Sequence, residues 1–207
     1  KFMLLIEKWL ARYTDVLLVM NQHDCTVAHK YHLADNIAFI DGMGIDTTKF
    51  PPITPQEVSK LRNELQIASD DFVFLYAGEF SKRKNQAMLM KAFQKAHRAC
   101  PNTKLILLGE GKLLPFCKRL ANELQLQNAI YFGGYVTEMN RYYRLADAVV
   151  STSKSEGLPF NIMEALVCNV PIIASKVKGH VDLIKHEQNG LLFDIDDMHQ
   201  LESQMVG

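Results

Sequence analysis

Residues 151–171 read STSKSEGLPFNIMEALVCNVP and carry two glutamates, Glu156 and Glu164, with seven residues between them. The apolar run DAVV just before this stretch predicts a buried strand. The residues from Pro159 onward predict a helix, because a proline in the first turn loses no hydrogen bond. We therefore expect Glu156 in the strand-to-helix loop and Glu164 about two turns further along. Gly157 allows a close backbone approach, and a helix N-terminus offers free N–H groups to an anion. Such a loop suits a ligand that is both negative and rich in hydroxyl groups, such as a nucleotide sugar.

The composition describes a packed, neutral protein. The chain has 207 residues, of which 48% are hydrophobic and 22% charged, so a folded core of one large or two small domains is expected. Its formal net charge is zero, which predicts no nucleic-acid partner and only a local phosphate site. The four scattered cysteines form no C-x-x-C pair and suit a reducing cytoplasm. No apolar run approaches the roughly 20 residues of a transmembrane helix.

The first part of the chain is expected to belong to a different domain from the rest. Residues 1–13 predict an amphipathic helix, 16–20 a strand, 24–32 a short helix and 37–40 a second strand. The glycine-containing segment DGMGID that follows predicts a turn. The chain begins with lysine rather than methionine, from which we expect it to be a piece of a longer protein.

From Phe50 onward, apolar strands alternate with helices. Strands are predicted at residues 72–77, 104–108, 129–132, 148–151, 171–174 and 190–193, and helices at 55–65, 85–98, 112–124, 139–145, 159–167 and 198–206. This alternation predicts an α/β, doubly wound, Rossmann-like domain with a parallel sheet covered on both faces. Ligands of such domains bind beyond the carboxyl ends of the strands. Each motif described below follows a predicted strand.

Three consecutive cations, Lys82, Arg83 and Lys84, follow the first of these strands and precede a helix. Cations at a helix N-terminus oppose the helix dipole, so a bound anion would be favourable there. Lysine supplies a point charge and arginine a fork, and both suit a diphosphate. A solvated basic loop is the alternative, but the position at the ligand-binding edge favours a phosphate site.

Two further glycine motifs follow the next strands. Gly109 and Gly111 form a G-x-G turn that lacks the third glycine of a dinucleotide fingerprint, so a tight turn and a ligand contact both remain open. Tyr135 and Val136 follow a pair of glycines, along which a nucleobase could slide. Tyr135 could then stack on the base or, alternatively, fill the core.

Together, Glu156-Gly-Leu-Pro, Glu164-Ala and the later Pro-Ile-Ile-Ala-Ser resemble the signature of retaining GT-B glycosyltransferases of family 4. The resemblance runs from about Asn36 to the end of the chain. It implies that the chain is the C-terminal, donor-binding half of a GT-B fold. Residues 55–207 would bind the nucleotide sugar, 36–54 would link the domains, and 1–35 would be the tail of a truncated N-terminal, acceptor-side domain.

The resemblance also implies roles for individual residues. Glu164 would hold the ribose hydroxyls, and Glu156 would be the catalytic residue beside the donor sugar, supporting a developing oxocarbenium ion. Lys84 matches the donor-phosphate lysine. The family arginine that usually follows the glycine is Glu79 here, and Arg83 is the candidate substitute. The remaining donor-binding positions are Gly109 and Gly111 beside the nucleotide, Tyr135 and Val136 at the base, and Gly157, Leu158 and Pro159 near the sugar or phosphate.

By the same resemblance, the whole enzyme is expected to move a sugar, with retention, from a nucleoside diphosphate donor, in particular a UDP-sugar, to a glycan or lipid-linked glycan. We expect polysaccharide or glycolipid synthesis at the inner, cytoplasmic face of a membrane, with peripheral membrane association of the full-length enzyme. The donor is a substrate, no cofactor is required, and the histidines form no metal motif. The fragment alone should bind nucleotide with little turnover.

Other functions are compatible with parts of the pattern. They are a nucleotide-sugar epimerase of the same architecture, a non-catalytic nucleotide-sugar-binding module and, least favoured, a dinucleotide-dependent oxidoreductase. A paired-carboxylate hydrolase fits poorly, because one glutamate would be occupied by ribose.

Overall fold

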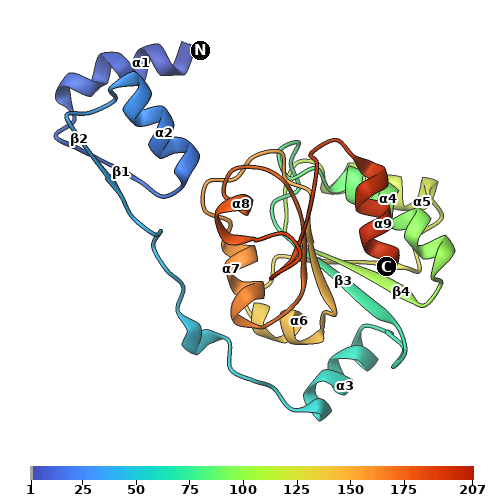
Figure 1. The fold of residues 1–207 in the computed structure, drawn as a ribbon. Helices are drawn as coiled ribbons and strands as arrows, with labels where there is room; N and C mark the ends of the chain where they lie inside the picture. Colours follow the sequence, from blue (N-terminus) through green and yellow to red (C-terminus); the bar gives the residue numbers. More distant parts are fainter. Residues whose placement is uncertain (1) are drawn as a thin grey trace.

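The computed structural model describes residues 2–207 and consists of two units of unequal size (Figure 1). The smaller unit contains α1 (Phe2–Leu10), a 3-10 helix (Ala11–Tyr13), β1 (Val16–Val19), α2 (Gln22–Tyr31) and β2 (Asn36–Phe39). Strands β1 and β2 pair in parallel. The helix predicted for residues 1–13 therefore tightens into a 3-10 turn at its end, and Lys1 lies outside the described residues.

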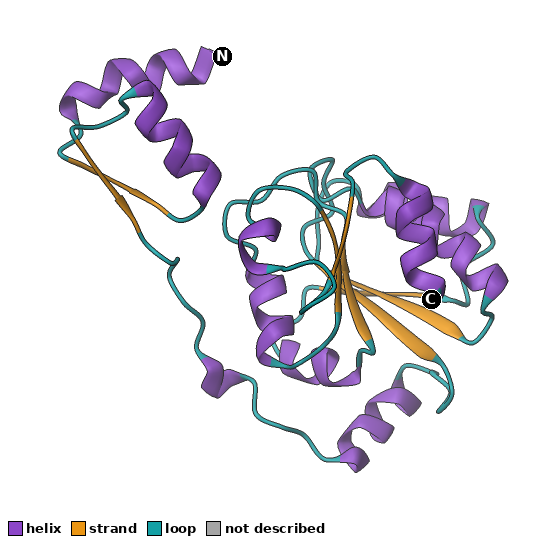
Figure 2. Ribbon diagram, in the orientation of Figure 1, coloured by secondary structure: helices purple, strands orange, loops and turns teal. Residues whose placement is uncertain are grey.

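An extended segment leads from the smaller unit to the larger one (Figure 2). It contains a single 3-10 turn (Thr47–Lys49) before α3 (Pro55–Glu64) begins. Thr54 caps α3: its hydroxyl accepts from the Glu57 N–H, and the Glu57 carboxylate accepts from the Thr54 N–H. This reciprocal pair and the proline at the first helical position explain why α3 starts where the sequence predicts.

The larger unit is the doubly wound α/β domain that the sequence predicts. Its elements are β3 (Phe72–Ala77), α4 (Gln86–Ala99), β4 (Thr103–Leu108), α5 (Leu114–Glu123), β5 (Ile130–Gly134), α6 (Met139–Leu145), β6 (Ala148–Ser151), α7 (Phe160–Val167), β7 (Ile172–Ser175), α8 (His180–Leu183), β8 (Leu191–Phe193) and α9 (Met198–Val206). All six strands are parallel, in the order β5-β4-β3-β6-β7-β8. The strand order therefore reverses between β3 and β6, where such a fold opens a crevice for ligands.

Helices cover both faces of this sheet (Figure 2). Successive strand side chains point to opposite faces, so Phe74 and Tyr76 pack toward α4, α5 and α9, whereas Val73 and Leu75 pack toward α3, α6 and α7. All four of these side chains are almost completely buried. This two-sided burial is the reason that the strands read as continuous apolar runs in the sequence.

The short helix α8 is the one element of the larger unit that the sequence does not predict. Its four residues are too few to show a helical period. Gly179, with φ of +82°, precedes it, and the Gly179 N–H donates to Asp182. The other elements predicted for the larger unit are present, with ends that differ by at most two residues.

The smaller unit contacts the larger one next to α8. The Lys178 ammonium lies 2.8 Å from an Asp24 carboxylate oxygen, and the Gln22 N–H donates to Asp182 at 3.2 Å. A methyl group placed on Gly42 would lie 3.1 Å from the Leu158 side chain, in the loop between β6 and α7. The smaller unit therefore faces the loops that leave the carboxyl ends of β6 and β7.

Candidate functional site

The loops that follow β3 and β6 lie side by side at the reversal of the strand order. The Lys154 N–H donates to the Arg83 carbonyl at 2.8 Å, and the Thr152 hydroxyl donates to the Lys84 carbonyl at 3.1 Å. These bonds hold the cationic loop against the loop that carries Glu156. Two motifs that are 72 residues apart in the chain are thus brought together.

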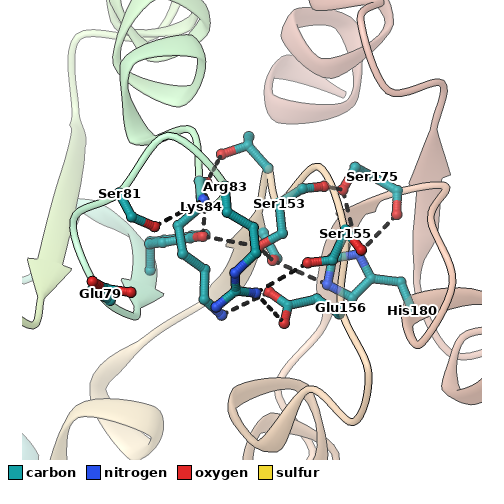
Figure 3. Close-up of polar contacts among 12 residues, drawn as sticks. Glu79, Ser81, Arg83, Lys84, Ser153, Ser155, Glu156, Ser175 and His180 are labelled. Atoms are coloured by element: carbon teal, nitrogen blue, oxygen red, sulfur yellow. Dashed lines mark hydrogen bonds and ion pairs between the residues drawn. The ribbon is translucent and has the colours of Figure 1, made fainter. Parts of the chain in front are cut away.

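Both oxygens of Glu156 bind a cation in this arrangement (Figure 3). Lys84 Nζ donates to Oε1 at 2.7 Å, and Arg83 Nη1 donates to Oε2 at 2.7 Å and to the Ser155 carbonyl at 3.0 Å. The Glu156 and Lys84 side chains are 7% and 11% exposed, whereas that of Arg83 is 47% exposed. We call these three residues the charged cluster. The anion that these cations contact is a carboxylate of the same chain, and the diphosphate predicted for them stays a prediction.

The charged cluster keeps Glu156 ionised. Burial acts to raise the pKa of this carboxyl, but the hydrogen bond from Lys84 and the charges of Lys84 and Arg83 together bring the pKa below its ordinary value. Glu156 is therefore a carboxylate at neutral pH. An ionised carboxylate is not a neutral general acid, and the charge-stabilising role expected of Glu156 stays a prediction.

Two charged residues of the first loop do not join the cluster. The Lys82 side chain is exposed, so the alternative of a solvated basic residue applies to it. Glu79 is also exposed, and its carboxylate stands apart from the cluster in Figure 3. Its backbone carbonyl accepts from Gln86 in the first turn of α4, which gives this position a structural contact.

Glu164 lies on α7, four residues after the helix begins, which is about 6 Å along its axis. Its half-buried carboxylate accepts a 2.7 Å hydrogen bond from the Tyr143 hydroxyl on α6. Burial raises the pKa of Glu164, and the bond from Tyr143 only partly opposes that effect. Tyr143 is fully buried and belongs to no sequence motif, and the sequence prediction misses it because the contact joins two different helices.

A buried polar network lies behind the charged cluster. Its members are Tyr76, Ser151, Ser153, Ser175 and His180. The Tyr76 hydroxyl lies 2.9 Å from the Lys84 carbonyl and 3.2 Å from the Ser153 hydroxyl, and His180 Nε2 lies 3.2 Å from the Ser151 hydroxyl. Burial lowers the pKa of His180, so this imidazole is neutral at pH 7. The network links the ends of β3, β6 and β7 and supports the loops from which Lys84 and Glu156 project.

Gly109 and Gly111 let neighbouring loops approach closely. A Cβ atom on Gly109 would lie 2.2 Å from the Gly78 carbonyl oxygen, and one on Gly111 would lie 2.5 Å from the Phe80 carbonyl oxygen. Their φ angles are +124° and +147°, a region that favours glycine. Packing alone therefore requires both glycines, and their contact with a nucleotide stays a prediction.

The other predicted donor-binding residues lie on loops at the same edge of the sheet. Tyr135 follows β5 and is 75% exposed, so the alternative that it fills the core is wrong. Val136 is half-buried against the core. A Cβ atom on Gly157 would meet nothing within 4 Å, and Leu158 and Pro159 then lead into α7. The β6–α7 loop thus leaves room beside Gly157 for a ligand to approach.

A cavity of about 870 Å³ lies at the opposite, amino edge of the sheet. Residues that begin strands line it, among them Phe72, Thr103, Ile172 and Leu191. It is separate from the charged cluster, and its mostly apolar lining offers no cation to a phosphate. Residues 2–207 contain no group of three metal-ligating side chains and no helix long and apolar enough to cross a bilayer.

Comparison with protein families gives one match over most of the chain. The family model described as "Glycosyl transferases group 1" matches residues 57–205. EpsD of Bacillus subtilis (strain 168), provisionally named a glycosyltransferase, is 32% identical over 193 residues, which are 93% of this chain and 51% of EpsD. The Escherichia coli UDP-Gal:alpha-D-GlcNAc-diphosphoundecaprenol alpha-1,3-galactosyltransferase is 25% identical over 98% of this chain and 54% of its own. The chain thus spans about half the length of these relatives.

Solved structures agree with the fold. Anabaena Alr3699/HepE, in a crystal structure with UDP and glucose, superposes with a TM-score of 0.87 at 24% identity, over 98% of this chain and 55% of that protein. WaaG, a glycosyltransferase involved in lipopolysaccharide biosynthesis, superposes with a TM-score of 0.80 at 17% identity, over 92% of this chain and 52% of its own. The expected C-terminal half of a GT-B fold is therefore confirmed as a fold.

Proposed function

We propose, from the premise that this chain belongs to the group 1 glycosyl transferases, that its larger unit is the donor-binding half of a retaining, family 4 enzyme. The donor is a nucleoside diphosphate sugar. The observation that carries this proposal is the charged cluster at the reversal of the strand order, with Glu164 on the helix that follows. One activated sugar has both a diphosphate for the cations and a ribose for the carboxylate.

Lys84 and Arg83 are the proposed phosphate ligands. Both cations project from one loop toward Glu156, and the three side chains together carry a net charge of +1 (two cations and one anion). Arg83 is half-exposed, so its guanidinium can turn toward a ligand at little cost. It would supply the second phosphate cation in place of the arginine that Glu79 replaces.

Glu164 and Glu156 divide the remaining work. Glu164 accepts hydrogen bonds from the ribose hydroxyls, because a carboxylate offers several lone pairs and only one is used by Tyr143. Glu156 is the proposed catalytic carboxylate, which stabilises positive charge that develops on the donor sugar as its bond to the diphosphate breaks. Backbone N–H groups near Gly157 and Leu158 would hold sugar hydroxyls or phosphate oxygens. Gly109, Gly111 and the exposed Tyr135 complete the nucleotide side.

The relatives support a UDP-sugar as donor and a glycan or lipid-linked acceptor. The similar galactosyltransferase of E. coli is named for UDP-Gal and a diphosphoundecaprenol-linked sugar, and HepE crystallised with UDP and glucose. Another relative, from Acholeplasma laidlawii, is an alpha-monoglucosyldiacylglycerol synthase, 27% identical over 68% of this chain and 35% of its own. We propose that residues 1–35 belong to the acceptor-side domain and that the whole enzyme works at the cytoplasmic face of a membrane.

Calorimetric titration of the chain with UDP, GDP, ADP and NAD tests the proposal. UDP is expected to bind best and NAD not to bind. Lys84→Met should weaken pyrophosphate and UDP but not uridine, whereas Glu164→Gln should weaken uridine and UDP but not pyrophosphate. Equal affinity of the wild type and both variants for UDP would contradict the two roles.

A further inference from the structure

The carboxylate of Glu164 has an incomplete set of partners. Among the residues that the structure describes, the Tyr143 hydroxyl is its one hydrogen-bond partner, at Oε2. A carboxylate can accept about four hydrogen bonds, so several lone pairs on its two oxygens remain for a ligand. The single bond that is made therefore decides which way the remaining lone pairs point.

Tyr143 is held too firmly to follow a moving carboxylate. Its side chain is fully buried, and its ring packs edge-on against Phe50 with 6.2 Å between centroids. The next residue, Arg144, donates to the Phe50 carbonyl at 2.8 Å and to the Cys168 carbonyl at 3.0 Å, where α7 ends. Helix α6 is thus fastened both to the segment before α3 and to α7, and the hydroxyl of Tyr143 is a fixed point.

We infer that Tyr143 is a positioning residue, which holds the Glu164 carboxylate in the orientation that receives both vicinal hydroxyls of a ribose. It thereby makes the site selective for ribonucleotide over 2′-deoxyribonucleotide donors. This inference rests on the proposed function, since it assumes that Glu164 faces the ribose. It adds to the proposed function a residue of α6, Tyr143, and a property that depends on that residue, the discrimination between ribose and 2′-deoxyribose.

The protonation behaviour of the pair agrees with a donor at Tyr143 and an acceptor at Glu164. Burial, and then the neighbouring Glu164 charge, raises the pKa of Tyr143 well above its ordinary value, so the hydroxyl keeps its proton at neutral pH. Burial raises the pKa of Glu164, and the bond from Tyr143 lowers it again in part. Loss of the hydroxyl would leave a half-buried charge with no donor, which is free to turn toward water.

The decisive experiment compares UDP, 2′-deoxy-UDP and pyrophosphate by calorimetry on the whole chain. The wild type should prefer UDP over 2′-deoxy-UDP about tenfold, the value of one hydrogen bond to a charged acceptor. Tyr143→Phe should reduce this preference toward that of Glu164→Gln and leave the affinity for pyrophosphate within about twofold of wild type. Tyr142→Phe is the matched control, because it removes a hydroxyl from the adjacent residue of α6 and should change neither quantity.

The outcomes separate the inference from the proposed function. If the wild type binds neither UDP nor pyrophosphate, the proposed function fails and the inference falls with it. A second outcome overturns only the inference. In that outcome the wild type prefers UDP over 2′-deoxy-UDP, Glu164→Gln loses this preference, and Tyr143→Phe keeps it in full. A folded Tyr143→Phe variant that weakens pyrophosphate as much as UDP would also overturn the positioning role, because its effect would not be confined to the ribose.

A second measurement serves if Tyr143→Phe does not fold. Incorporation of 3-fluorotyrosine at position 143 retains the ring and hydroxyl and makes the hydroxyl a stronger donor. Its fluorine resonance should shift on addition of UDP, shift less with 2′-deoxy-UDP and stay unchanged with pyrophosphate. A resonance that does not respond to UDP would contradict the inference.

Discussion

Replacement of Glu156 by glutamine should destabilise the protein and, at the same time, strengthen its binding of diphosphate. The change keeps the shape of the side chain and removes its charge. Lys84, whose side chain is 11% exposed, would then keep only an amide oxygen as its partner. Removal of one member of a buried ion pair costs about 3–5 kcal/mol, and we expect the lower end because the amide still accepts one bond. Loss of the ion pair with Arg83 adds little to this cost, because the half-exposed guanidinium is solvated.

A loss of about 3 kcal/mol corresponds to a fall in melting temperature of about 6–12 °C for a chain of this size. Binding of diphosphate should reverse most of this loss of stability. In the wild type an entering anion must compete with Glu156 for both cations, whereas in the variant these cations have no internal anion. We therefore expect pyrophosphate to bind Glu156→Gln about tenfold more tightly, a difference of about 1.4 kcal/mol.

Thermal unfolding over a range of pyrophosphate concentrations measures both quantities. A ligand at 100 times its dissociation constant stabilises the native state by about 2.7 kcal/mol, nearly the whole of the expected loss. Glu79→Gln is the matched control, because it removes one negative charge from an exposed carboxylate of the same loop, outside the cluster. Equal melting temperatures of Glu156→Gln and wild type would refute the energetic reasoning. Equal stabilisation of both by pyrophosphate would refute the competition.

Three further predictions concern stability. Glu164→Gln should be more stable than the wild type at pH 8, because the folded-state pKa of Glu164 is raised and ionisation above that pKa opposes folding. The urea midpoints of the two proteins should therefore differ at pH 8 and coincide at pH 4. The effect of Glu156→Gln should depend on pH in the opposite way, because the folded-state pKa of Glu156 lies below its ordinary value of 4.5. The stability that its charge contributes is present above pH 4.5 and is lost as the pH falls through the lower folded-state pKa. The melting temperatures of Glu156→Gln and the wild type should therefore converge only at that low pH. Gly109→Ala should lower the free energy of unfolding by more than about 2 kcal/mol in a denaturant titration, because the new methyl group would lie 2.2 Å from a carbonyl oxygen. Gly44→Ala is the control: its methyl group would meet nothing within 4 Å, so it should cost only the backbone strain of about 1 kcal/mol.

The sequence predicts the fold well where apolar runs are bounded by turn residues. The bounds of β3 and β6 agree residue for residue, because each is an apolar run with a buried centre next to a polar or glycine turn. The starts of α4 and α5 are less well predicted. Asn85 adopts a left-handed backbone before α4, and Gly111 leads into two turn residues before α5, so each helix begins later than its periodicity suggests.

The site is only partly predictable for a different reason. The sequence identifies Lys84 and Glu156 as candidates, and both follow strands, but it does not show that β3 and β6 are neighbours. That neighbourhood places the two side chains in contact and turns a predicted anion site into an ion pair. The contribution of Tyr143 is hidden for the same kind of reason, because a hydrogen bond between α6 and α7 leaves no spacing pattern in either helix.

The two glutamates of the site differ in pKa because of their surroundings, although they are the same residue type. Burial raises the pKa of both, yet the pKa of Glu156 ends below its ordinary value and that of Glu164 above it. The difference lies in their partners, since Glu156 has two cations and Glu164 has one neutral hydroxyl. Glu156 is therefore satisfied before any ligand arrives, and a diphosphate must exchange one ion pair for another. Glu164 has a single donor, so lone pairs remain that the hydroxyls of a ribose would fill. For the proposed nucleotide sugar, this reasoning predicts that most of the net affinity comes from the nucleoside end and that the diphosphate end exchanges more readily.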